Sequence, residues 1–130
     1  MNFGFDGAGL ESLFNDLNTA GAKVVPVVRG VVNRGALNVK SDARRLFEEQ
    51  RVGDYLPHYS RSITYDVESA GGFVSAEVGP EVGKVQGPFG PGVEFGSVNH
   101  AAMPHLAPAL DAEEPRFVGQ WGDAAVGLLL

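Results

Sequence analysis

The chain has 130 residues, about the size of one ordinary domain, with 10 basic and 16 acidic side chains, a net charge of −6 and no cysteine. The acidic balance argues against a broad basic surface for nucleic-acid phosphates. The lack of cysteine excludes disulfides, thiolate metal sites and a thiol nucleophile. With 44% hydrophobic residues the chain should fold, and its 18 glycines and 8 prolines predict long loops. We therefore expect a single domain over residues 1–130.

No apolar segment approaches the roughly 20 residues that span a bilayer, and the N-terminus lacks a basic region followed by an apolar run. The expectation is a protein made in the cytoplasm, without a membrane partner. Residues 1–8 are expected to be a flexible start. A short amphipathic helix follows in the prediction, because the next apolar residues have helical spacing: Leu10, Leu13, Phe14 and Leu17.

A long helix is predicted over residues 23–51. Its apolar residues recur every three or four positions: Val25, Val28, Val32, Ala36, Val39, Ala43 and Leu46. Pro26 is tolerated in the first turn of such a helix. Because four heptads barely fit and alanines occupy the stripe, packing on a sheet is favoured over a coiled coil.

A β-hairpin is predicted next, since the hydrophobic period changes to two. Residues 63–67 alternate as a half-buried strand, residues 69–72 form a turn, and residues 73–78 form the second arm. Residues 79–92, rich in glycine and proline, predict a protruding loop with a short extended piece at 84–86.

Two more elements complete the predicted α+β fold. Residues 93–96 are read as a third strand. A C-terminal helix is expected from Leu106 to Leu128, which Pro115 should kink or split. The whole is a long N-terminal helix packed on a small antiparallel sheet, with a long loop and a C-terminal helix.

One enzymatic alternative is a metal-dependent or serine hydrolase whose site lies around Glu94, His100 and His105. Imidazole and carboxylate are ordinary zinc or iron ligands. The two histidines are separated by four residues that include Pro104, however, which matches neither a zincin helix nor a zinc finger.

The serine version pairs Ser60 or Ser62 with His58, without a nucleophile-elbow motif around either serine. Glycine-rich phosphate loops are also missing from the sequence. The interpretation is therefore a structural or interaction protein, with no enzyme activity, catalytic residue, metal or cofactor.

The order of several segments resembles the small neck and tail-completion proteins of long-tailed bacteriophages, over residues 28–117. After the long helix come LPHYSRSITYDV and its hairpin partner GGFVSAEVGPEVG. An aromatic-glycine motif, GVEFGS, then precedes a proline-rich link into the last helix, MPHLAPALDAEEPRF.

This resemblance implies a virion protein of the head–tail connector, without enzyme activity, that forms a hexameric ring between the head-completion or connector proteins and the tail terminator or tail tube. DNA would pass through the lumen without specific binding. A tail terminator ring is the nearest alternative. The residues expected at subunit contacts are Glu94, Phe95, Gly96, His100, His105, Arg61 and Arg44. In this interpretation Phe95 buries apolar area against a neighbour, Glu94 meets a neighbour's arginine, and the two arginines meet acidic groups.

Overall fold

The structure is a computed structural model that describes residues 2–6, 21–70 and 73–129, with side chains from residue 24 onward. The elements in chain order are β1 (Asn2–Asp6), α2 (Gly21–Gln50), the 3-10 turn η1 (Tyr59–Ser62), β2 (Ile63–Ala70), β3 (Phe73–Pro80), the 3-10 turn η2 (Gly87–Phe89), α3 (Gly90–Phe95) and α4 (Leu106–Leu129). The short helix predicted from Leu10 to Leu17 lies outside the described residues.

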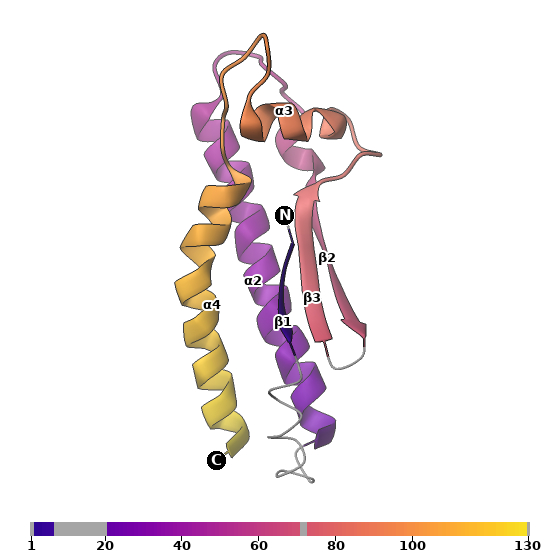
Figure 1. Cartoon of the computed structure of the whole chain (residues 1–130), viewed down its shortest axis with the longest axis vertical. Helices are drawn as coiled ribbons and strands as arrows, with labels where there is room; N and C mark the ends of the chain where they lie inside the picture. The colour runs from indigo at the N-terminus through magenta and orange to yellow at the C-terminus, as the bar shows by residue number, and fades with distance from the viewer. Residues whose placement is uncertain (1, 7–20, 71–72, 130) are drawn as a thin grey trace.

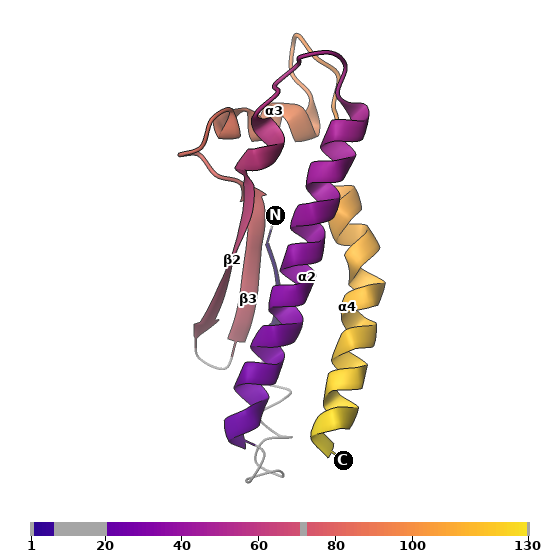
Figure 2. The ribbon, with the colours of Figure 1, turned by 180° about the vertical axis from the view of Figure 1, so that it is seen from behind.

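The two long helices run side by side, and α2 lies between α4 and the β2–β3 hairpin (Figures 1 and 2). The short helix α3 sits across one end of the molecule, and the C-terminus lies at the opposite end, as Figure 1 shows. This arrangement confirms the predicted α+β class, in which a long helix covers a small antiparallel sheet.

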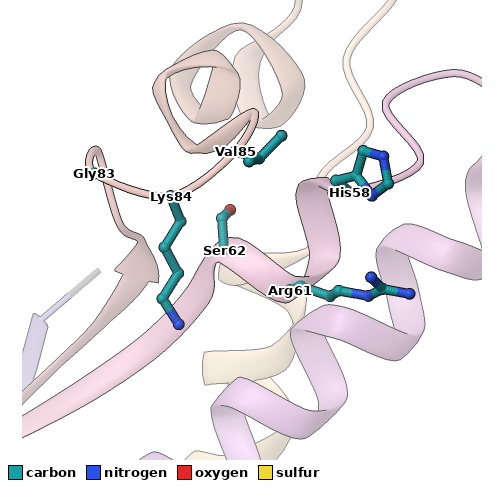
Figure 3. Close-up of a pocket in the computed structure, with 6 residues that line it drawn as sticks. All are labelled: His58, Arg61, Ser62, Gly83, Lys84 and Val85. Atoms are coloured by element: carbon teal, nitrogen blue, oxygen red, sulfur yellow. The ribbon is translucent and has the colours of Figure 1, made fainter.

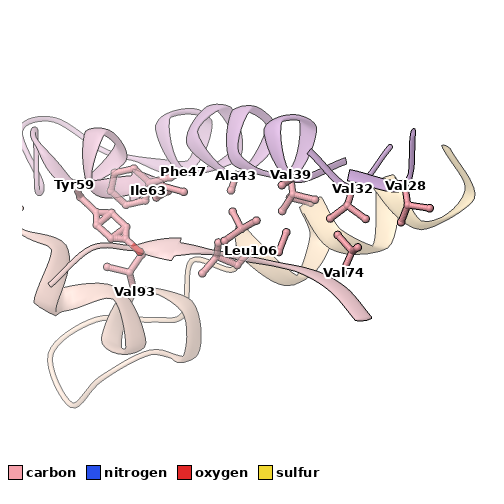
Figure 4. Close-up of a cluster of buried hydrophobic side chains, with 14 of the residues drawn as sticks. Val28, Val32, Val39, Ala43, Phe47, Tyr59, Ile63, Val74, Val93 and Leu106 are labelled. Atoms are coloured by element: carbon pink, nitrogen blue, oxygen red, sulfur yellow. The ribbon is translucent and has the colours of Figure 1, made fainter. Parts of the chain in front are cut away.

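One buried stripe of α2 forms the centre of the core (Figure 4). Its members are Val24, Val28, Val32, Ala36, Val39, Ala43 and Phe47. The predicted stripe is correct in its middle and wrong at both ends, because Val25 is exposed and Leu46 is only half-buried. Each end offers two adjacent apolar residues, and the helical period alone does not decide which one faces the core.

The hairpin is confirmed, with β2 and β3 antiparallel from Ile63 opposite Pro80 to Ala70 opposite Phe73. Alternate residues of β3 are buried against α2: Val74, Ala76 and Val78. Residues 1–8 were expected to be flexible, but Asn2–Asp6 forms β1, which pairs with the other edge of β3. The sheet order is therefore β1-β3-β2. Gly71 and Gly72 of the predicted turn lie outside the described residues.

The glycine- and proline-rich segment after β3 is packed more closely than the prediction of a protruding loop. The side chains at the 82–85 tip are exposed, but residues 84–86 form turns rather than an extended piece. Gly87 is buried, and a Cβ there would overlap the carbonyl oxygen of Glu81. Glycine at this position permits close packing instead of loop freedom.

The predicted third strand is wrong, since residues 93–95 belong to helix α3. Pro88 and Pro91 stand near the starts of η2 and α3, where a missing N–H has no helical partner. Gly96 ends α3 with a positive φ of 87°, and its N–H donates to the carbonyl oxygen of Gly92 at 2.9 Å. Pattern reading missed this short helix because it has fewer than two turns.

Helix α4 continues through Pro115 and is not split. Pro115 is exposed, whereas the opposite face of α4 packs along α2 and buries Ala109 and Glu113. Packing along the inner face holds the two halves in one helix despite the missing backbone bond. Neither long helix, over the described residues, is apolar enough to cross a membrane.

Candidate functional site

The candidate site is the end of the molecule that carries α3, and its anchor is the buried side chain of Glu94. The Glu94 carboxylate accepts hydrogen bonds from the backbone N–H groups of His105 at 3.1 Å, Leu106 at 2.8 Å and Ala107 at 3.3 Å. These N–H groups belong to the start of α4 and have no partner within the helix. A carboxylate from another helix thus caps α4, where the helix dipole favours negative charge.

His105 extends this network to η1. Its Nδ1 lies 2.9 Å from the carbonyl oxygen of Met103 and 3.2 Å from Glu94 Oε1, and its Nε2 lies 2.9 Å from the Tyr59 hydroxyl. Both neighbours of Nδ1 are acceptors, so we assign the proton to Nδ1, and the Tyr59 O–H donates to Nε2. Phe47 of α2 packs against both rings. Four elements therefore meet at one buried polar cluster.

Burial keeps this cluster neutral apart from the carboxylate. Burial lowers the pKa of His105, although the Met103 carbonyl and the Glu94 charge oppose the change. Burial, followed by the Glu94 charge, raises the pKa of Tyr59 far above its ordinary value. The order Glu94, His105, Tyr59 looks like that of a catalytic triad. Tyr59 is fully buried and strongly favours the neutral phenol, however, so the cluster positions three elements instead of activating a nucleophile.

The surface outside this cluster includes several exposed large apolar side chains. On α3, Val93 and Glu94 face inward, whereas Phe95 is 81% exposed. Other large apolar side chains are exposed in the segments at the same end: Val52, Val82, Val85, Phe89 and Val98. These segments, 51–62 and 81–105, hold three basic and three acidic residues, so the net charge of −6 resides in the remainder of the chain. Several exposed large apolar side chains, on segments that have no net charge, are a feature of surfaces that contact another protein.

A pocket of about 460 Å³ next to this surface gathers basic side chains: it is lined by His58, Arg61, Ser62, Gly83, Lys84 and Val85 (Figure 3). The Arg61 and Lys84 side chains extend to opposite sides of Ser62, so their charges do not converge on one point. Ser62 donates its hydroxyl proton to the Tyr59 carbonyl oxygen at 2.6 Å. The geometry therefore fits neither a phosphate clamp nor an activated serine.

The residues of the hydrolase alternative are separated. Glu94 and His105 are buried together, but His100 is exposed and its ring lies 4.3 Å from that of Tyr55. The Ser60 hydroxyl donates to Glu48 Oε1 at 2.8 Å and not to His58. Within the described ranges, no three histidine or acidic side chains are grouped as metal ligands would be.

Three residues predicted at subunit contacts instead make their polar contacts within the subunit. Glu94 and His105 are buried in the cluster described above. The Arg44 guanidinium donates to the Ile63 carbonyl oxygen at 2.7 and 3.0 Å, which ties α2 to the start of β2. Sequence alone places an acidic residue beside Phe95 without revealing that Glu94 is buried and Phe95 is exposed. The side chains of Phe95, His100 and Arg61 do reach the surface, and Gly96 turns the chain.

Two residues of structural importance escaped sequence reasoning. Tyr59 gave no periodic signal because it lies in an irregular segment. Glu113 is buried between the helices, where Asn38 Nδ2 donates to its Oε1 at 3.0 Å. Its Oε2 lies 3.2 Å from Arg116 Nε without hydrogen-bond geometry. A single acidic residue on the apolar face of a predicted helix was the available signal.

The chain matches no protein-family model, no curated protein and no solved structure.

Proposed function

We propose that the chain is a structural subunit of a bacteriophage head–tail connector, assembled as a ring through which DNA passes. The end that carries α3 is its docking surface for a neighbouring protein of the neck. The resemblance of segment order along the chain supports this assignment, and the structure supplies a physical rationale for the docking surface.

The observation that carries the proposal is the two-sided character of α3. Phe95 is 81% exposed, although it directly follows Glu94, whose carboxylate binds three backbone N–H groups of α4. The exposed ring therefore stands on a rigid support. Preformed aromatic side chains cost little conformational entropy on binding and often dominate the affinity of protein interfaces.

The charge distribution is compatible with a DNA-conducting ring. The three strands hold four acidic residues, Asp6, Asp66, Glu68 and Glu77, and no basic one. Like charge on a lumen surface would keep passing DNA from adhering. The neutral α3 end, in contrast, can approach another protein without a large electrostatic penalty.

Assembly measurements test the proposal. The purified chain should form a ring visible by electron microscopy, alone or together with the connector and tail-tube proteins of its phage. A cryo-EM map of the virion should place it in the neck. The Phe95→Ser subunit should fold normally but join heads to tails poorly. The control is His58→Ser, which changes another exposed residue at the same end of the molecule and should leave joining unchanged.

Location elsewhere in the particle, or absence from it, would refute the neck assignment. Location directly on the end of the tail tube would instead favour the tail terminator. Normal joining of heads to tails by the Phe95→Ser subunit would mean that α3 is not part of the docking surface.

A further inference from the structure

Helix α4 is attached to the rest of the fold unevenly on the two sides of Pro115. Before this residue, residues 106–114 start under the Glu94 carboxylate and bury three side chains, the last of them Glu113. After it, residues 116–129, the arm, contain no side chain that is buried. The apolar side chains with which the arm contacts the core are only partly covered: Phe117, Trp121 and Leu128. Contact with the core is therefore less complete along the arm.

The arm also packs incompletely against α2. A hollow of about 320 Å³ lies between the two helices, lined by Val27, Val31 and Arg34 of α2 and by Gln120, Asp123 and Ala124 of the arm. The Oε1 atom of Gln120 is buried and accepts no hydrogen bond within the described residues. A hollow beside an unpartnered polar atom leaves dispersion contacts and a hydrogen bond unmade. The docked position of the arm is therefore not fully stabilised.

The backbone adds a second weakness at the start of the arm. Pro115 has no N–H, so the carbonyl oxygen of Asp111 lacks the helical hydrogen bond that another residue at position 115 would donate. The arm holds three glycines, at positions 119, 122 and 127, whereas residues 106–114 hold none. Glycine lowers helix stability because it loses more backbone freedom on folding than other residues do. The arm thus combines a missing bond at its base with a reduced intrinsic preference for the helix.

We infer that Pro115 is a hinge, and that the arm detaches from α2 as a unit while residues 106–114 stay in place. Local openings of this kind occur at free energies below that of global unfolding, in segments with few buried contacts. The fixed half is retained by its hydrogen bonds with Glu94 and Asn38. The docking surface at the α3 end then stays intact whichever position the arm takes. Opening of the arm is a property of the isolated chain and does not depend on the proposed function.

Hydrogen–deuterium exchange of the isolated chain, measured by NMR at each amide, tests the hinge. Amides of residues 117–129 should exchange at one common rate, about tenfold or more faster than those of residues 109–114, with the step at Pro115. A rate that instead rises gradually toward Leu129 would mean ordinary fraying of a helix end and would overturn the hinge. Equal protection on both sides of Pro115 would overturn it as well.

Two proline replacements separate the hinge from general helix stability. Pro115→Ala, at an exposed position, supplies an N–H for the Asp111 carbonyl oxygen and should slow exchange of the arm by about tenfold or more. Pro108→Ala is the matched control, because Pro108 lies in the first turn of α4, where a missing N–H has no helical partner. It should leave exchange of the arm unchanged. Unchanged exchange in Pro115→Ala, or the same slowing in both variants, would contradict the hinge.

Trp121 supplies a second measurement, since it is the only tryptophan of the chain and lies on the arm. In a urea titration its fluorescence should change at a lower urea concentration than the far-ultraviolet ellipticity, which follows the secondary structure of the whole chain. In Pro115→Ala the two transitions should move closer together. Coincident transitions in the unmodified chain would mean that the arm unfolds only with the rest of the molecule, and would overturn the inference.

Discussion

Glu94 and His105 are joined twice, through the backbone N–H of His105 at 3.1 Å and through its ring Nδ1 at 3.2 Å from Glu94 Oε1. The same oxygen also accepts the N–H of Leu106 at 2.8 Å. One carboxylate therefore fixes both the first turn of α4 and the ring that contacts Tyr59. The position of α3, and with it the exposed Phe95, depends on this pair.

Removal of the Glu94 carboxylate should destabilise the fold. Glu94→Ala is expected to lower the free energy of unfolding by about 2 to 3 kcal/mol, because three helix N–H groups lose a charged acceptor. Glu94→Gln, which retains one acceptor oxygen, should lose about 1 kcal/mol. Urea titrations of both variants measure the difference. Glu114→Ala, at an exposed position of α4, should stay within about 0.5 kcal/mol of the unmodified chain. A Glu94→Ala loss that small would contradict the capping role.

Stability should fall in mildly acidic solution because of His105. Its folded pKa is lowered by burial, so the unfolded chain, with an ordinary histidine pKa of about 6.5, binds the proton first. The free energy of unfolding should therefore decrease as the pH falls below about 6.5, with a slope of up to about 1.4 kcal/mol per pH unit.

Urea titrations at several pH values between 7.5 and 5 measure this slope. The His105→Gln variant should show a shallower dependence on pH, whereas His100→Gln should keep that of the unmodified chain because His100 is exposed. Equal slopes in all three chains would mean that His105 titrates normally in the folded protein.

Phe47 rather than Leu46 should be the larger contributor to the α2 core. Phe47→Ala is expected to cost about 3 to 5 kcal/mol of unfolding free energy, since the ring is fully buried against Tyr59 and His105. Leu46→Ala should cost less than about 2 kcal/mol because Leu46 is half-buried. Chemical denaturation of the Phe47→Ala and Leu46→Ala variants compares the two costs directly. A larger loss for Leu46→Ala would mean that Leu46, as predicted from the sequence, belongs to the buried stripe.

Gly83 and Gly87, two of the three glycines of the 81–90 segment, should respond differently to a methyl group. Gly87→Ala is expected to cost about 1 to 3 kcal/mol, because its Cβ would overlap the Glu81 carbonyl oxygen. Gly83→Ala has no heavy atom within 4 Å of the new Cβ and should change stability by less than about 0.5 kcal/mol. Thermal unfolding of both variants is sufficient. Equal tolerance at both positions would support the freely protruding loop that the composition suggested.

Periodic elements were predictable because their pattern repeats over several turns or residues. The α2 stripe from Val28 to Ala43 and the alternation of Val74, Ala76 and Val78 each define a buried face without knowledge of the partner. The ends of the α2 stripe were not predictable in the same way. At each end two neighbouring apolar residues compete for the core, and the packing partner decides between them.

The sequence by itself determined the α+β class, the long helix, the hairpin and the C-terminal helix, since local periodicity specifies which face of each element is apolar. Tertiary structure decided the roles of single residues. Glu94 lies 11 residues before His105, and no local pattern indicates that its carboxylate reaches the start of α4. Likewise, β1 becomes a strand by pairing with β3, some 70 residues later in the chain. Contacts between distant segments determine which side chains are buried, and therefore that Phe95, rather than Glu94, is presented on the surface.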